Sequence, residues 1–267
     1  MELMFRWLEG LAGEEGRRLG QSVSALPGRS TFGSGSGDPF DAAEFSEREG
    51  AGTLRMAWNV DPERVREGAI ADFLGTRGVE FPGIAELLVQ EKGAHVQVGV
   101  DGDKTKLYAY RSPTTSLLAR LAEAVGGRLR SDARFLCVDF DPTPVLKQYA
   151  EYADAKAVDA GGTLFSEPHL RAVVSALPPG LPQHPAALVV TERQVHGVVV
   201  GHSLHVRVHE APERLGDLAG TSLAERLAER YRAAARLGLR LCPTYVSWST
   251  LGAPSLLRTA YYRLERR

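Results

Sequence analysis

Pairs of strand-like segments joined by tight turns recur along the sequence, and a helix pattern separates one pair from the next. In the clearest pair, "AHVQVGV" and "KTKLYAY" flank the turn "DGD", which is a strong short-range signal for a β-hairpin. The clearest helix is "TSLAERLAERYRAAARLG", with Ser222 and Glu225 in capping-box spacing and Gly238 at its end. This order differs from the strict strand–helix alternation of parallel sheets, so an antiparallel sheet is predicted.

The other segments follow the same order, with one irregular unit in the middle. Residues 133–141 are predicted as a strand and residues 142–159 as a helix, so the region from Phe135 to Leu181 supplies only one clear strand. The remaining predicted elements are a helix at 2–26, a strand pair at 41–60, a helix from Asp61 whose pattern resumes at 81–93, a helix at 112–127, a short helix at 167–177, and strand pairs at 186–210 and 239–265.

An antiparallel sheet of about ten strands would leave long open edges, and closing the sheet removes them. We therefore predict an α+β fold, an antiparallel β-barrel of about ten strands ringed by α-helices and built from repeated α-β-β-α units. The 267 residues suit a single domain that spans 1–267.

Composition and charge narrow the class of protein. The formal net charge of −1 argues against a general nucleic-acid or membrane-surface binder. The two cysteines, Cys137 and Cys242, lie in apolar strand-like runs and are too few for a disulfide framework or a cysteine zinc site. The first residues lack the basic and then apolar order of a signal peptide, so none is expected, and no apolar run approaches about 20 residues. We expect a cytoplasmic protein without a nucleic-acid or membrane partner; its oligomeric state stays open.

Several predicted strands have one apolar face and one face that carries cations. In "HSLHVRVHE", Leu204 and Val206 alternate with His205 and Arg207. Faces that point to water usually mix acids with bases, but these faces carry no matching acids. A cluster of cations in a barrel interior is costly unless an anion binds there, and a diphosphate would suit. The cations are Arg55, Lys104, Lys106, Arg207 and Arg258.

The stretch "GDKTKLYAYRSP" places two lysines and two tyrosines at every second position. In a strand, Lys104, Lys106, Tyr108 and Tyr110 share one face. If that face points inward, the two ammonium groups would meet an anion and the two phenol rings would line the space beside it. If it points outward, the row is only a solvated edge.

Two segments resemble the soluble aromatic prenyltransferases of the ABBA type, in their indole branch. Residues 30–62 resemble the family's entry segment, with a serine-rich loop, a Pro-apolar-acid motif on the first strand and an arginine on the next. Residues 98–113 resemble its hairpin that ends in a Lys-x-Tyr strand. The element order agrees over about two-thirds of the chain. The chain is shorter than is usual in this branch.

The resemblance implies roles for individual residues, and Arg55, Lys106 and Tyr108 match best. Arg207 and His209 fall where the family more often has Arg-x-Lys-x-Tyr. The residue that accepts a proton from the indole N–H would be Asp41, which follows "PF", with Glu44 as the rival. With the strand-face pattern, the diphosphate ligands would be Arg55, Lys104, Lys106, Arg207 and Arg258. The side chains that shield the allylic cation would be Tyr108, Tyr110, Tyr245 and Tyr262.

The resulting hypothesis is an enzyme that moves a prenyl group from an allylic diphosphate, such as dimethylallyl diphosphate, to an aromatic, indole-type acceptor. Asp139 and Asp141 in "DFDP" are interpreted as a strand end, so neither a metal site, Mg²⁺ nor another cofactor is implied. His205 and His209 would lie about 13 Å apart along one strand, too far for one zinc ion. The alternatives are a non-catalytic α+β protein that binds an anionic metabolite, and a biosynthetic cyclase with a similar cavity.

Overall fold

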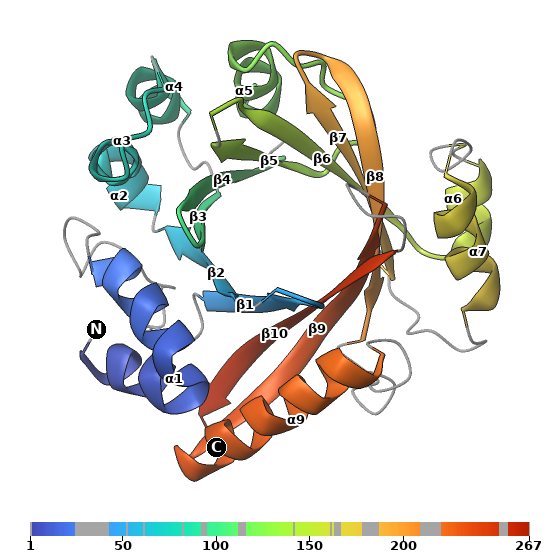
Figure 1. The fold of residues 1–267 in the computed structure, drawn as a ribbon. Coiled ribbons are helices and arrows are strands. Elements are labelled where there is room, and N and C mark those ends of the chain that lie inside the picture. Colours follow the sequence, from blue (N-terminus) through green and yellow to red (C-terminus); the bar gives the residue numbers. More distant parts are fainter. Residues whose placement is uncertain are drawn as a thin grey trace.

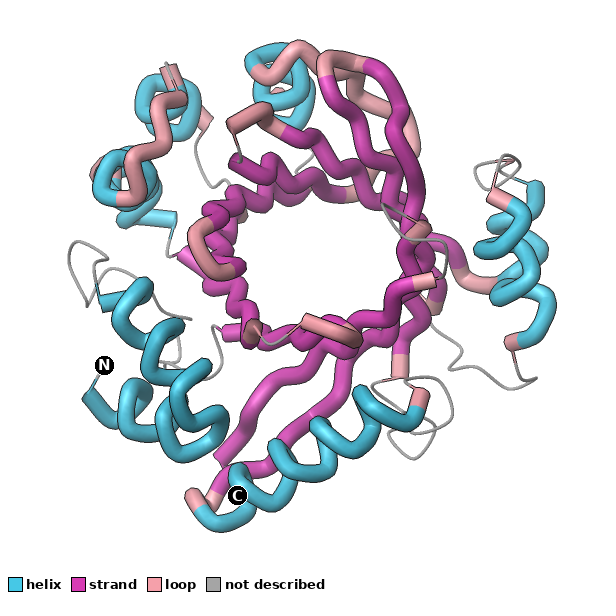
Figure 2. Tube along the Cα trace, viewed as in Figure 1, coloured by secondary structure: helices cyan, strands magenta, loops and turns pink. Residues whose placement is uncertain are grey.

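Ten antiparallel strands form a closed barrel in the computed structural model (Figures 1 and 2). Each strand pairs with the next in the chain, and β1 pairs with β10 to complete the ring. The strands are β1 (Ala43–Arg48), β2 (Leu54–Val60), β3 (Val96–Asp101), β4 (Lys104–Tyr110), β5 (Phe135–Phe140), β6 (Val145–Tyr152), β7 (Leu188–Val195), β8 (Val198–Arg207), β9 (Leu239–Ser249) and β10 (Leu257–Arg266).

The structure describes most of the chain, and the ranges it covers include every strand. They are residues 2–24, 43–51, 53–60, 62–81, 83–91, 95–111, 116–140, 142–160, 162, 167–177, 187–208, 220–250 and 256–266.

Helices surround the barrel on the outside (Figure 2). They are α1 (Glu2–Ser24, kinked at Gly13), α2 (Pro62–Arg66), α3 (Ala69–Thr76), α4 (Ile84–Gln90), α5 (Leu117–Ala124), α6 (Ala155–Ala160), α7 (Pro168–Ala176) and α9 (Thr221–Arg236). The longest of the later helices, α9, lies across β9 and β10 and beside α1. None of the described helices is long and apolar enough to span a membrane.

Strand alternation separates the hydrophobic core from the barrel interior. On β8, Leu204 and Val206 are fully buried and face the outer layer, whereas His205 lies on the inner wall. The core therefore lies between the outer face of the barrel and the helices, where burial of apolar side chains stabilises both layers. The predicted closed α+β barrel is confirmed, and the interior is left for polar side chains.

The structure corrects one predicted element, since the expected helix at 142–159 begins as β6 and only ends in α6. Leu146 and Ala150 are buried on the outer face, while Lys147 and Tyr149 line the interior. This period of two fits a strand. The helix-favouring composition of "VLKQYAEY" is overridden by pairing with β5 and β7. The barrel is thus complete although the sequence indicated one strand in this region.

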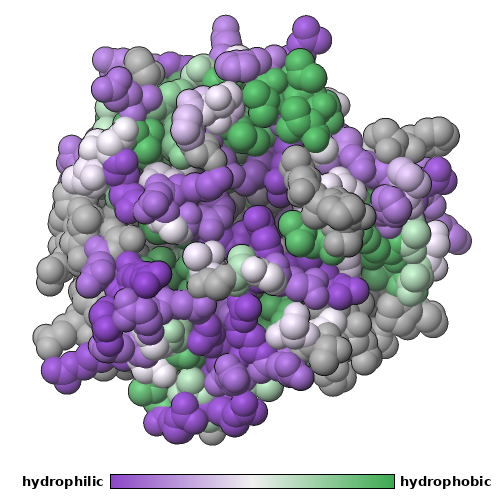
Figure 3. Space-filling view, in the orientation of Figure 1, coloured by the Kyte–Doolittle hydropathy of each residue, from purple (hydrophilic) through white to green (hydrophobic). Residues whose placement is uncertain are grey.

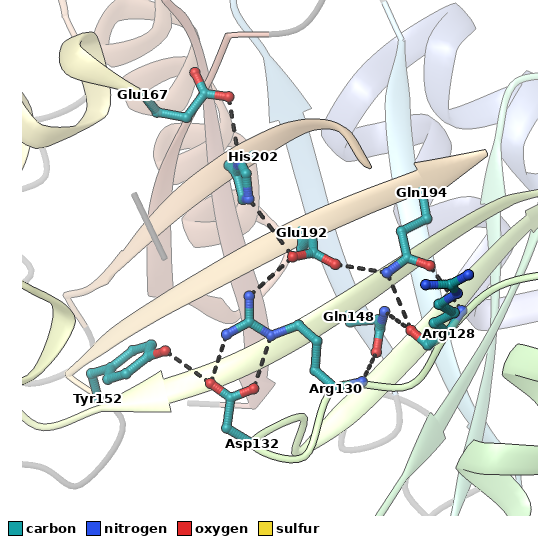
Figure 4. A network of polar contacts seen from close by, with 9 residues as sticks. All are labelled: Arg128, Arg130, Asp132, Gln148, Tyr152, Glu167, Glu192, Gln194 and His202. Atoms are coloured by element: carbon teal, nitrogen blue, oxygen red, sulfur yellow. Dashed lines mark hydrogen bonds and ion pairs between the residues drawn. The ribbon is translucent and has the colours of Figure 1, made fainter. Parts of the chain in front are cut away.

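A polar network on the outer face fixes the segment that joins α5 to β5 (Figure 4). The backbone N–H of Arg130 donates to Gln148, and the Arg130 guanidinium contacts Asp132 and Glu192. His202 joins the network through Glu192 and through Glu167, the residue before α7. Burial alone would lower the pKa of His202, but its hydrogen bonds to the two glutamates raise it. The network ties β6, β7 and β8 to the outer elements.

A buried ion pair connects α9 to the barrel. Glu47 on β1 is 0% exposed and accepts hydrogen bonds from Arg230 at 2.9 Å and from the Tyr262 hydroxyl at 2.9 Å. Arg230 also donates to Glu15 and to the Leu11 carbonyl of α1. One arginine therefore joins α1, α9 and β1.

We predict that Glu47→Ala lowers the free energy of unfolding by about 3–5 kcal/mol, because it leaves the Arg230 guanidinium buried without its main counter-charge. Urea unfolding would measure the loss. Glu14→Ala, which removes one of the two exposed glutamates that pair with Arg17, is the control and should leave the stability nearly unchanged. Wild-type stability of Glu47→Ala would contradict this account.

Candidate functional site

The barrel encloses a cavity of about 270 Å³, lined by side chains from all ten strands. Seen along the barrel, the surface around the opening is largely hydrophilic (Figure 3). Residues two apart on a strand share a face and lie about 7 Å apart, so each strand supplies a short column of side chains. The columns form three levels along the barrel axis.

The first level is a cationic cluster, which we define as Arg48, Arg55, Lys106, Lys147 and Arg193. Two carboxylates contact it. Asp101 lies 2.7 Å from Lys106 Nζ and 3.7 Å from Arg55, and Asp139 pairs with Lys106 at 3.7 Å and with Lys147. Five cations against two acids leave an excess of positive charge on a buried wall.

Burial changes the proton affinities in this cluster. It lowers the pKa of Lys147 to about 8, although Asp139 opposes the effect. Burial alone would raise the pKa of Asp139, but Lys106 and Lys147 lower it to about 2. The Nε atoms of Arg55 and Arg193 are buried and have no hydrogen-bond partner in the described part of the chain. Such unsatisfied donors favour an anionic ligand.

The second and third levels carry an arc of rings. Tyr110 stacks on Phe135 with ring centroids 5.0 Å apart, and Phe135 stacks on Tyr149 at 4.1 Å. The arc continues through His205, 5.9 Å from Tyr149, to Tyr261 at 5.5 Å. Tyr108 also lines the cavity. Burial raises the pKa values of Tyr108 and Tyr149 well above the ordinary range, which keeps both as neutral phenols.

Glu44 lies at the third level, away from the cationic cluster along the strand of Arg48. Its Oε1 accepts a 2.8 Å hydrogen bond from Thr244. Burial raises the pKa of Glu44, while Arg263 and the Thr244 hydrogen bond partly oppose the rise. Tyr245 and Arg263 line the cavity at the same level. A carboxyl group here can accept a proton or a hydrogen bond from a ligand in the cavity.

Most of the predicted site residues meet in this one cavity. Arg55, Lys106, Tyr108, Tyr110, Tyr245 and the rival acid Glu44 all line it. Arg207 shares the inner register of β8 with His205 and lies opposite Tyr245, but it is not among the lining residues. Asp41 and His209 lie outside the described residues.

Three predicted residues do not face the cavity. Lys104 is exposed at the start of β4, beside the turn. On β10 the inner face carries Tyr261, so Arg258 and Tyr262 point outward. Arg258 lies 3.6 Å from Glu49. The sequence-based choice of face for β10 was therefore wrong, because the outer face is also polar where Tyr262 contacts the buried Glu47.

The sequence prediction missed most of the cavity wall. Among the charged and aromatic side chains that it did not name as site residues are Arg48, Phe135, Lys147, Tyr149, Arg193 and Tyr261, and it gave His205 no role beyond its place on the polar face of its strand. One signal was available. Lys147-x-Tyr149 repeats the pattern of Lys106-x-Tyr108, and the Arg-x-Lys-x-Tyr pattern sought at Arg207 fits β6 better, with Val145 at the arginine position. The described residues contain no group of three or more His, Cys, Asp or Glu side chains that could hold a metal ion.

Solved structures of tryptophan prenyltransferases share this fold. The chain is similar to 5-dimethylallyl tryptophan synthase from Streptomyces coelicolor, crystallised with DMASPP and Trp, with 16% identity and a TM-score of 0.65 over 97% of this chain and 92% of that one. It is similar to the prenyltransferase PriB bound to product diphosphate, with 16% identity and a TM-score of 0.68 over 98% and 95%.

A third similar structure is 6-dimethylallyltryptophan synthase from Micromonospora olivasterospora, with 16% identity and a TM-score of 0.61 over 98% of this chain and 95% of that one. The sequence matches no protein-family model and no curated protein. At these identities the comparisons establish the fold, and the chain thus has the ABBA barrel of the soluble aromatic prenyltransferases that its sequence resembles.

We predict that Thr244→Val raises the pKa of Glu44 further, because it removes a hydrogen bond that stabilises the carboxylate. A ¹³C NMR titration of the glutamate carboxyl carbons would measure it, with the Glu44 signal assigned by its loss in Glu44→Gln. Thr259→Val makes the same change elsewhere on the cavity wall, beside Arg55, and should leave the Glu44 titration unchanged. An unshifted curve in Thr244→Val would contradict the prediction.

Proposed function

We propose that the protein transfers a prenyl group from an allylic diphosphate, such as dimethylallyl diphosphate, to an aromatic acceptor of the indole type. The reaction is an electrophilic alkylation. The allylic C–O bond breaks and its electron pair leaves with diphosphate; a π pair of the acceptor ring then forms the new C–C bond, and a ring proton is lost. The observation that carries the proposal is the cationic cluster joined to an arc of aromatic rings inside one cavity of the closed barrel.

The cationic cluster supports a diphosphate as the ligand. A diphosphate carries several negative charges, and the cluster has an excess of positive charge with two unpartnered guanidinium Nε donors. Charge-assisted hydrogen bonds in a buried site stabilise the negative charge that develops on a leaving diphosphate. We propose that these side chains, rather than Mg²⁺, neutralise the leaving group.

The arc of rings supports an allylic cation as the species that follows departure of diphosphate. Tyr108 and Tyr149 each follow a lysine of the cluster by two residues, so a ring lies about 7 Å further along the barrel from each ammonium group. Aromatic faces attract a cation and exclude the water that would quench it. Their raised pKa values keep the two tyrosines protonated.

The position of Glu44 supports a prenyl acceptor that carries an N–H group. A buried carboxylate can accept a hydrogen bond from an indole N–H and raise the electron density of the ring, which favours attack on the allylic cation. With Asp41 outside the described residues, Glu44 is the acid that we assign to this role. The similar synthase from Streptomyces coelicolor was crystallised with DMASPP and Trp, ligands of the two classes proposed here.

The proposal is tested by incubating the protein with dimethylallyl diphosphate and a panel of indoles that includes L-tryptophan, with and without EDTA. Mass spectrometry should detect an acceptor that has gained one prenyl unit, in both conditions. If no acceptor gains mass while the protein still binds diphosphate, the alternative of a non-catalytic protein for an anionic metabolite is favoured instead.

Two lysines of one strand allow a matched test of diphosphate binding. We predict that Lys106→Ala weakens the binding of inorganic diphosphate by about 10–100-fold, the loss of one charge-assisted hydrogen bond. Lys104→Ala removes the same charge from the same strand but outside the cavity, and it should change the affinity little. Isothermal titration calorimetry would compare them. Equal effects of the two variants would refute the placement of diphosphate at the cluster.

A further inference from the structure

His205 is a half-buried ring on the cavity wall to which the proposed function assigns no role. It lies on β8 in the arc of rings, between Tyr149 at 5.9 Å and Tyr261 at 5.5 Å. The side chains that line the wall around it are Lys147 and Tyr149 of β6, Val189, Thr191 and Arg193 of β7, Ser203 of β8, Ser247 of β9 and Tyr261 of β10. None of these neighbours is an acid that would favour an imidazolium.

The surroundings keep this imidazole neutral. Burial, assisted by the positive charges of Arg193 and Lys147, lowers the pKa of His205 to about 3. A neutral imidazole has one N–H and one nitrogen lone pair. Nε2 lies 2.9 Å from Thr191 Oγ1, and Nδ1 makes no hydrogen bond within the described part of the chain. In the tautomer in which Nε2–H donates to Thr191, Nδ1 presents its lone pair to the cavity.

The proposed reaction requires a base at this level of the barrel. Attack of the ring on the allylic cation forms an arenium cation, which becomes aromatic again only when it loses a ring proton. Asp101 and Asp139 are held in ion pairs with lysines of the cluster. The charges of Glu44 and Glu151 both raise the pKa of Tyr245, so these two acids lie near Tyr245 at the third level. The other histidine of the arc, His95, stacks on Tyr110 and is hydrogen-bonded to Asn59, and it does not line the cavity. Among the described residues, His205 is thus the uncharged nitrogen base of the rings that line the cavity, where the cation would form.

We propose that His205 is the general base that removes the ring proton of the alkylated acceptor; this inference rests on the proposed function. The ring C–H bond breaks, its electron pair restores the aromatic ring, and the proton forms a bond to Nδ1. The diphosphate released at the adjacent cluster then accepts the proton from the imidazolium. A weak base suffices, because an arenium cation is a strong acid, and a neutral base does not repel the cations that precede it.

His205→Phe separates this role from shielding, since phenylalanine keeps an aromatic ring in the arc and removes the base. We expect kcat to fall about 100-fold, the usual contribution of a positioned base. The decisive readout is the isotope effect with L-tryptophan or free indole deuterated at every ring carbon. In the wild-type protein the rate should be insensitive to deuterium. In His205→Phe the loss of the proton should become slow and a primary isotope effect should appear.

His205→Gln is a second variant of similar size that also lacks the base, and it should behave in the same way. Inorganic diphosphate should bind both variants as it binds the wild type, which shows that the cavity is intact. Near-wild-type kcat in His205→Phe, or a reduced kcat without an isotope effect in both variants, would overturn the proposal and leave the released diphosphate as the base. Failure of the wild type to alkylate any indole would instead reject the proposed function.

Discussion

Closure of the sheet by pairing of β1 with β10 is the constraint on which the rest of the structure depends. Phe45 pairs with Tyr262 across this junction, and the ring of ten strands has no free first or last strand. Once the ring closes, every second residue of each strand must point inside and its neighbour outside. The same alternation that buries Leu204 and Val206 beneath the helices therefore fixes His205 on the wall of the cavity.

The positive charge of the cavity is concentrated at one level of the barrel. Like charges held together in a buried space are unfavourable unless acids or a ligand compensate, and Asp101 and Asp139 compensate only part of the cationic cluster. The buried Glu47–Arg230 pair shows the opposite case on the outer face, where the charges balance and the ion pair joins two helices to a strand. Buried charges are therefore balanced at the Glu47–Arg230 pair, whereas the cationic cluster of the cavity has an excess of positive charge.

The sequence predicted the class of fold because hairpin turns and helix caps are local signals. It also predicted that Lys106 and Tyr108 of β4 face the interior, because two such side chains at a spacing of two share one face of a strand. It failed on β6, whose residues favour a helix in isolation and become a strand only through pairing with both neighbours. It also failed on β10, because both faces of that strand carry polar and aromatic side chains, and the register with β1 and β9 decides which face is the inner one.

The direction of the chain explains why Arg48 and Arg193 were harder to recognise than Lys106 and Lys147. On β4 and β6 the cation comes first and the ring follows two residues later. On β1 and β7 the chain runs the opposite way, so Arg48 and Arg193 come last in their inward columns, and the residue two positions earlier is Ser46 or Thr191 rather than a ring. A Lys-x-Tyr motif therefore finds β4 and β6 and misses the cations of β1 and β7. When the inward residues of each strand are compared with the direction of that strand taken into account, all of these cations fall at one level of the barrel. The neutral ring of His205 then lies at the level between the cations and Glu44.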